Sequence, residues 1–188
     1  LAAQKNYQTV GNTADEADVL LALSKTYGIF MRPDDAHLSN EAAIEITQKL
    51  GDQLGFANAL AQMGEINIQQ LIYDEAQKFI LRSMPIFKDF HDAVGNARCQ
   101  ALLAKIELAH AQFDNAMTLA SQALAQFQKT DNFNAQVDIL SLIGWICIYQ
   151  NNFDAAQNNL NQAEMLLDVH QSNAGRSELY LRFGLLSE

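Results

Sequence analysis

Proline, glycine and cysteine are scarce in this sequence, and each scarcity excludes a class of structure. The 188 residues contain two prolines and nine glycines, too few for a sandwich of short strands joined by tight turns or for a flexible linker. Cys99 and Cys147 form no Cys-x-x-Cys motif and have no histidine at metal-ligand spacing. We therefore predict two free, buried thiols in a reducing compartment, with no metal site and no cofactor.

Long apolar runs and clustered cations are also missing. No apolar segment approaches the roughly 20 residues that cross a bilayer, and no secretion signal is visible. We expect no membrane contact by this segment and a cytoplasmic location; Leu1 is not an initiator Met, so this expectation concerns the given segment alone. Twelve Lys and Arg against twenty-two Asp and Glu give a net charge of −10. Because the cations are scattered, nucleic acid is not an expected partner.

What the sequence does contain is a repeat of forty residues. Tyr73, Phe113 and Phe153 are spaced at forty, and Pro33 holds the same place earlier in the chain. Two further columns come shortly after these residues. One is Asp34, Asp74, Asp114 and Asp154, and the other is Ala36, Ala76, Ala116 and Ala156. Three further columns are Gly55, Gly95, Ala135 and Gly175; Leu23, Met63, Leu103, Ile143 and Phe183; and Ser24, Gly64, Ala104, Gly144 and Gly184. Such regularity indicates a repeat array.

Each repeat is predicted to form two helices. The first starts at the recurring Gly or Ala, as in "GNARCQALLAKIELAHAQ" over residues 95–112. The second starts at the recurring Asp, whose carboxylate can cap free N–H groups and face the positive end of the helix dipole. Gly64 opposite Ala76, and Gly144 opposite Ala156, should let two antiparallel helices approach more closely than the usual spacing of about 8–10 Å.

One proline interrupts this pattern. Pro85 lies within the second helix of the second repeat, where it removes a backbone donor and clashes with the carbonyl of Leu81. We predict a kink or break between residues 81 and 86.

A Leu or Ile beside a Gly in the first helix, with an Ala twelve residues after that Gly, resembles the tetratricopeptide repeat. The fourth repeat carries the pattern in Leu140, Ile143, Gly144, Ala156, Leu160 and Ala163, and the second in Leu60, Met63, Gly64, Ala76, Ile80 and Ser83. The usual Trp, the later aromatic residue and the closing Pro are missing. The forty-residue period is similar to the longer-helix subgroup typified by kinesin light chains and by sensor domains of bacterial regulators. The resemblance implies an all-α, right-handed superhelical solenoid of antiparallel helix pairs.

We predict a single array over residues 1–188. It comprises the tail of a preceding second helix (1–14), repeats at 15–54, 55–94, 95–134 and 135–174, and the first helix of a fifth repeat (175–188). The last segment, "GRSELYLRFGLLSE", has apolar residues on more than one face. Terminal repeats normally have a polar outer face, so we expect a further helix or another chain to cover it, including a homodimer through exposed terminal helices.

No catalytic set stands out. The sequence lacks the G-x-x-x-x-G-K-[ST], G-x-G-x-x-G, H-E-x-x-H and G-x-S-x-G motifs, and His37, His91, His110 and His170 lie far apart. We predict a non-enzymatic scaffold that binds a protein or peptide in a concave groove. The alternative is a sensory or regulatory module of a larger signalling protein, such as a transcriptional regulator or a nucleotide cyclase.

The outer face of the first helices offers the binding surface. Positions two after the Leu23 column point away from the paired helix at 100° per residue, and in the resembled family this side lines the peptide groove. These positions are Lys25, Glu65, Lys105, Trp145 and Leu185. We predict a recognition patch of Arg98, Lys105, Ser141, Trp145 and Tyr149. Alternatively, Trp145 packs on Leu181 and Leu185 of the next first helix.

Overall fold

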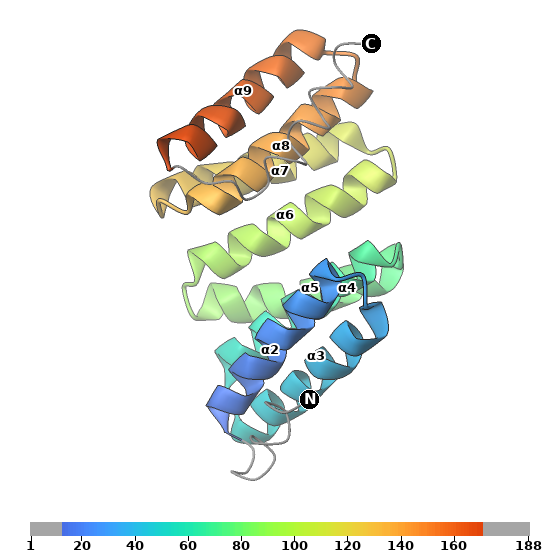
Figure 1. The fold of residues 1–188 in the computed structure, drawn as a ribbon, viewed down its shortest axis with the longest axis vertical. Helices are drawn as coiled ribbons and strands as arrows, with labels where there is room; N and C mark the ends of the chain where they lie inside the picture. Colours follow the sequence, from blue (N-terminus) through green and yellow to red (C-terminus); the bar gives the residue numbers. More distant parts are fainter. Residues whose placement is uncertain (1–12, 171–188) are drawn as a thin grey trace. The chain divides into compact units, whose positions relative to one another are not determined.

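The computed structural model describes residues 13–170, and every regular element in this range is a helix (Figure 1). In chain order the helices are α2 (Ala14–Ile29), α3 (Pro33–Leu50), α4 (Gln53–Gln69), α5 (Tyr73–Asp89), α6 (Ala93–Ala109), α7 (Phe113–Lys129), α8 (Phe133–Tyr149) and α9 (Phe153–Val169). From α4 onward, alternate helices begin forty residues apart. Within the described range, no helix is long and apolar enough to cross a membrane.

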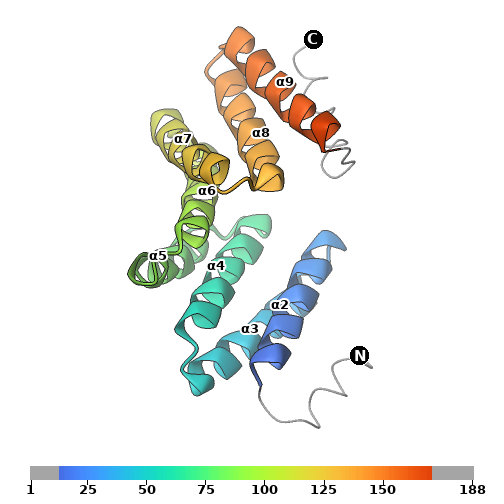
Figure 2. The same ribbon diagram turned by 90° about the vertical axis from the view of Figure 1, so that its left-hand side faces the viewer.

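The chain divides into two compact units, residues 1–102 and 103–188, and α6 contributes to both. In the first unit α2 packs on α3, α3 on α4, and α4 on α5; in the second, α7 packs on α8 and α8 on α9. Figure 2 shows these neighbours side by side. The predicted all-α fold of consecutive helix pairs is confirmed, whereas the repeat boundaries stay a prediction. Almost all of the two terminal segments predicted at 1–14 and 175–188 lies outside the described residues.

Small side chains let the helices of a pair approach closely, as predicted. Ala76 and Ala156 are fully buried. A Cβ atom added at Gly64 would lie only 2.5 Å from Cγ1 of Ile80 and 3.2 Å from the carbonyl oxygen of Ala76. One added at Gly144 would lie 2.9 Å from Cδ2 of Leu160. The space opposite each of these alanines is therefore closed to a side chain.

The predicted capping role of the recurring Asp is wrong. The second helices begin at the preceding Pro or aromatic position, and the N-cap residues of α3, α5 and α7 accept no side-chain hydrogen bond. The Asp side chains lie in the first turn, where the helix dipole still favours a negative charge.

Of the four second helices only α9 has a side-chain cap, where the amide oxygen of Asn152 accepts the N–H of Ala155 at 3.3 Å. The first helices α4, α6 and α8 are capped by a column that the sequence analysis missed. The carboxylates of Asp52 and Asp92 accept the N–H of Gly55 and Gly95 at 2.9 Å, and the amide oxygen of Asn132 accepts that of Ala135 at 3.3 Å. The hydrogen bonds donated by the two glycine N–H groups are shorter than the one donated by the N–H of Ala135. A Cβ atom at residue 55 would lie 2.1 Å from the Asp52 carboxylate, so the shorter bond is compatible with glycine there and not with a larger residue unless Asp52 shifts.

Helices end at a left-handed residue that is mostly not glycine. Leu71 has φ of 62° and His91 of 55°, and the next N–H turns back onto the helix, as where Ile72 donates to the carbonyl of Asn67 at 2.8 Å. Gly51 supplies this conformation at the end of α3, with φ of 71°. The scarcity of glycine therefore does not prevent short turns between the helices.

Both cysteines are free and buried, as predicted. The sulfur of Cys99 lies 3.1 Å from the hydroxyl oxygen of Ser83. Burial raises the pKa of the Cys99 thiol, although the Ser83 hydrogen bond and the Arg98 charge oppose this shift. Burial also raises the pKa of Cys147. Both thiols are therefore kept in the neutral form, and the reducing compartment stays a prediction.

The predicted break at Pro85 is wrong, because α5 runs from Tyr73 to Asp89 with Pro85 inside it. Pro85 is exposed, and so is Leu81, whose carbonyl loses its usual donor. The disturbed turn therefore faces solvent, where water can replace the missing donor. The bend of this helix stays a prediction.

We expect Pro85→Ala to raise the free energy of unfolding by about 1–3 kcal/mol, because alanine restores the backbone donor and removes the ring clash. Ala125 holds the same place in α7 and is also exposed, so Ala125→Pro should lower that free energy by roughly 3 kcal/mol. Urea unfolding of both variants measures this. Equal stability of Pro85→Ala and the parent chain would contradict the account.

Candidate functional site

The second unit contains an apolar cavity of about 590 Å³ at the ends of three helices. The end of α6, the turn that follows it, the first residue of α7 and the last two turns of α8 form its wall. The lining residues are Lys105, Leu108, Ala109, Ala111, Phe113, Leu142, Trp145 and Tyr149. Ala109 and Ala111 carry only methyl groups, which leaves the space open between the larger side chains.

Three aromatic rings form a continuous run along this wall. The ring centroids of Trp145 and Tyr149 are 5.8 Å apart at 23°, because residues four apart share one face of α8. Tyr149 also stacks on Phe113, at 5.9 Å and 9°. Gln150 ties the same helix end to α7 by donating to the Asp114 carboxylate at 3.2 Å. Trp145 is half-buried and Tyr149 is exposed, so the run presents ring surface to a ligand.

Lys105 is the cation at this cavity. It is exposed, and within residues 13–170 it has no carboxylate partner. Glu107 accepts from Asn115 and Asp114 from Gln150, both at 3.2 Å, and neither acid forms a salt bridge with Lys105. The cavity therefore combines ring surface with one positive charge that nearby acids do not bridge.

The structure brings together three of the five residues of the predicted recognition patch: Lys105, Trp145 and Tyr149. Arg98 belongs to the first unit, where it bridges Glu65 at 2.8 Å and contacts the side-chain oxygen of Gln62 at 3.4 Å. Ser141 is 6% exposed and does not line the cavity.

The sequence analysis missed five of the eight lining residues, Leu108, Ala109, Ala111, Phe113 and Leu142, and it left one alternative open. Phe113 carried a signal, because it belongs to the recurring aromatic column. Leu142 carried a weaker one, three residues before Trp145. Leu181 and Leu185, the alternative packing partners of Trp145, lie outside the described residues.

The first unit has a cavity at the equivalent place between α2 and α4, and its chemistry is different. Its volume is about 90 Å³, and it includes Lys25, Gln62, Glu65 and Gln69 among its lining residues. Gln62, Glu65 and Gln69 stand eighty residues before Leu142, Trp145 and Tyr149. The same place in the repeat is thus small and polar in one unit, large and aromatic in the other.

The lining of this cavity contains no His, Cys, Asp or Glu side chain. Across the helices that the structure describes, no group of three or more His, Cys, Asp or Glu residues could hold a metal ion. The cavity offers shape, stacked rings and one ammonium group, which are features of a binding site.

No protein-family model matches the chain, and no curated protein matches it. Solved structures do. BtubC (BKLC) from P. vanneervenii has a TM-score of 0.65 and 17% identity over 82% of this chain. Aspartyl phosphate phosphatase F from Bacillus subtilis has a TM-score of 0.76 and 13% identity over 92% of it. The apo form of RapI has a TM-score of 0.79 and 14% identity over the whole chain.

These similarities concern the fold. The chain spans 64% of BtubC, 45% of the phosphatase and 70% of RapI, so all three similar proteins are longer than this chain. With identities of 13–17%, they carry no residue roles to this chain. The structural similarities, together with the packing of consecutive helix pairs, show that the chain has the tetratricopeptide-like helical-repeat fold expected from its sequence.

We expect Trp145→Ala to cost less stability than Ile146→Ala, its matched neighbour. Ile146 is fully buried, and its truncation should cost about 2–5 kcal/mol. Half-buried Trp145 should lose mainly its stacking and part of its contact area, about 1–2 kcal/mol. Thermal melting of both variants compares them. A loss in Trp145→Ala as large as in Ile146→Ala would place Trp145 in the core.

Proposed function

We propose that this chain is a non-catalytic scaffold that binds a protein segment or peptide through the aromatic cavity of its second unit. The contrast between the two equivalent cavities carries this proposal. Helix pairing alone does not require Trp145 and Tyr149, since Glu65 and Gln69 occupy those places in the first unit. A concave groove along the first helices, as the sequence predicts, is part of this proposal.

The cavity suits a segment with an apolar residue followed by an acidic one. The apolar side chain would lie against Trp145 and Tyr149, which supply large contact area at low entropic cost. The acidic neighbour would pair with Lys105, whose charge the adjacent acids leave available. Arg98 contributes less than the sequence suggested, because Glu65 already neutralises it.

The alternative, a sensory or regulatory module of a larger signalling protein, has one observation in its favour. All three similar solved proteins are longer than this chain, which spans 64% of BtubC, 45% of the phosphatase and 70% of RapI. The same cavity would serve recognition in either setting, because repeat arrays expose long surfaces while each repeat contacts only its neighbours.

A titration with short capped peptides tests the proposal. A central Phe followed by Asp, Asn or Lys gives three probes, and Trp145, the single Trp of the chain, reports binding by fluorescence. We expect the Asp peptide to bind up to about fivefold tighter than the Asn peptide, the range of an exposed ion pair. The Lys peptide should bind most weakly, and salt should reduce the differences.

Variants at equivalent places in the two units provide matched controls. Tyr149→Ala should weaken the Asp peptide by roughly tenfold or more, whereas Gln69→Ala should not. Lys105→Gln should abolish the preference for Asp over Asn, whereas Lys25→Gln should keep it. The proposal fails if no peptide perturbs Trp145, or if Tyr149→Ala and Gln69→Ala behave alike.

A further inference from the structure

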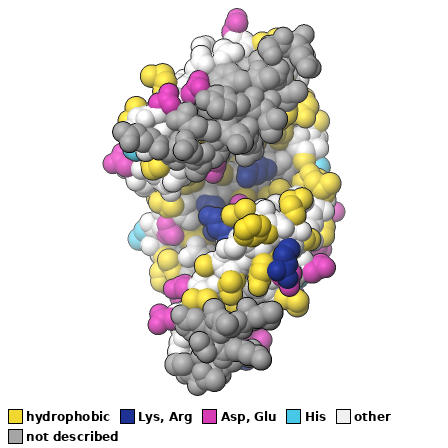
Figure 3. All heavy atoms as spheres, in the orientation of Figure 1, with side chains coloured by type: hydrophobic (Ala, Val, Ile, Leu, Met, Phe, Trp, Pro, Cys, Tyr) yellow, Lys and Arg dark blue, Asp and Glu magenta, His cyan; other side chains and the backbone are white. Residues whose placement is uncertain are grey.

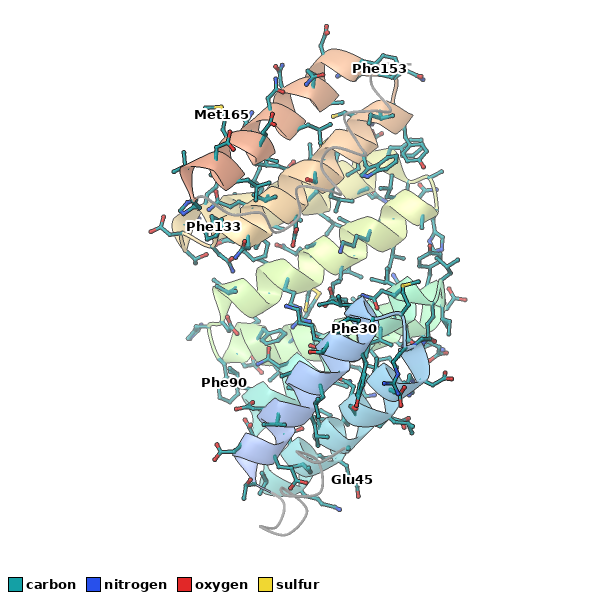
Figure 4. The ribbon with its side chains drawn as sticks, in the orientation of Figure 1. Phe30, Glu45, Phe90, Phe133, Phe153 and Met165 are labelled. Carbon is teal, nitrogen blue, oxygen red and sulfur yellow. The ribbon has the colours of Figure 1, made fainter. Side chains whose placement is uncertain are left out.

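Five large apolar side chains are exposed at two neighbouring turns of the first unit. The α2–α3 turn contributes three consecutive ones and the α4–α5 turn two. This apolar rim consists of Ile29, Phe30, Met31, Leu71 and Ile72, which are 43–87% exposed. Figure 3 shows hydrophobic side chains gathered at this end of α2, and Figure 4 labels Phe30 there.

The two turns lie side by side because the ends of α2 and α4 touch. A Cβ atom at Gly28 would lie 3.0 Å from the side-chain oxygen of Gln69, and Ile29 lines one small cavity with Ile66 and Gln69. The two groups of exposed apolar side chains therefore lie at neighbouring helix ends.

The fold does not require these apolar residues. Eighty residues later, the places of Ile29, Phe30 and Met31 hold Ala109, His110 and Ala111. Asn151 and Asn152 occupy the places that correspond to Leu71 and Ile72. Identical turns are thus built from small or polar side chains in the second unit. Clustered exposed apolar side chains of this kind typically mark an interaction site.

The acidic residues at the rim repeat with the forty-residue period, and in each turn one of the two carboxylates forms no salt bridge among the described residues. Arg32 bridges Asp35 at 2.6 Å, and Lys78 bridges Glu75 at 2.6 Å. Asp34 and Asp74 are exposed and form no salt bridge among the described residues.

Other cations do not cancel this surplus. Asp74 adds only a weaker attraction to Lys78, whose pKa is raised mainly by its hydrogen bond to Glu75. Lys25, the one Lys or Arg of α2, lines the small cavity that Glu65 also lines. The apolar surface is therefore bordered by two negative charges without bridging partners.

We propose that the apolar rim docks a protein segment that carries both apolar and basic residues, such as a basic amphipathic helix. Phe30 supplies a rigid anchor, and Met31 supplies an unbranched side chain that adapts to irregular surfaces. Asp34 and Asp74 select the basic partner. This surface is independent of the aromatic cavity and has the opposite charge preference.

Fluorescence anisotropy of a labelled amphipathic Leu/Lys peptide with the full chain tests this inference, with its Leu/Glu counterpart as the second probe. We expect the Leu/Lys peptide to bind and the Leu/Glu peptide not to. The double variant Phe30→Ser, Met31→Ser should weaken binding by at least about tenfold. Phe90→Ser is the matched control, because Phe90 is also an exposed C-cap residue of the first unit and should leave binding unchanged.

The charge variant Asp34→Asn with Asp74→Asn should weaken binding by several-fold, and added salt should remove the difference. Circular dichroism should show unchanged helical content in all variants, because the altered side chains are exposed. The inference is overturned if neither peptide binds, if both bind alike, or if the rim variant and Phe90→Ser have equal effects. Binding of the chain to neutral phosphatidylcholine vesicles, lost in the rim variant, would also overturn it in favour of a lipid surface.

Discussion

The close approach of the two helices in each pair is the constraint on which the rest of this structure depends. Ala36, Ala76, Ala116 and Ala156 are fully buried, and the facing positions are small. In the first pair Ser24 even donates its hydroxyl to the carbonyl of Ala36, at 2.8 Å. This contact fixes which face of each first helix is inside. Lys105 and Trp145 each follow a small contact position, Ala104 and Gly144, by one residue, about 100° around the helix, and so lie outside this contact.

Features that recur every forty residues could be predicted from the sequence. The prediction was wrong where the structure depends on the position or surroundings of one particular residue. The helix pairs and the small side chains at their contacts recur in every repeat, so they could be predicted from the columns of recurring residues. The Asp column repeats equally well, but its place one residue inside the helix start, which only the backbone reveals, makes it a first-turn charge rather than a cap. Pro85 breaks no helix because its disturbed turn faces solvent, which depends on helix rotation.

The candidate site shows the same division. Trp145, Tyr149 and Lys105 follow from helical spacing and come together. Arg98 is neutralised by Glu65, thirty-three residues away, and Phe113 joins the cavity through the packing of α7 on α8; neither is visible in a local pattern. The two units differ in their exposed surfaces. The first has an apolar rim beside two carboxylates, and the second has an aromatic cavity beside a lysine; none of these three charged groups forms a salt bridge among the described residues. We propose that one repeat thus supports two recognition chemistries.

The most direct test of this account is the unfolding free energy of Gly64→Ala beside that of Gly28→Ala. Both changes gain helix propensity, by up to about 1 kcal/mol. A Cβ atom at Gly64 meets Ile80 and the backbone of α5, whereas one at Gly28 meets only the flexible end of Gln69. We predict a net loss of about 1–2 kcal/mol for Gly64→Ala and no loss for Gly28→Ala. A Gly64→Ala variant as stable as the parent chain would contradict the claim that close helix approach governs the fold.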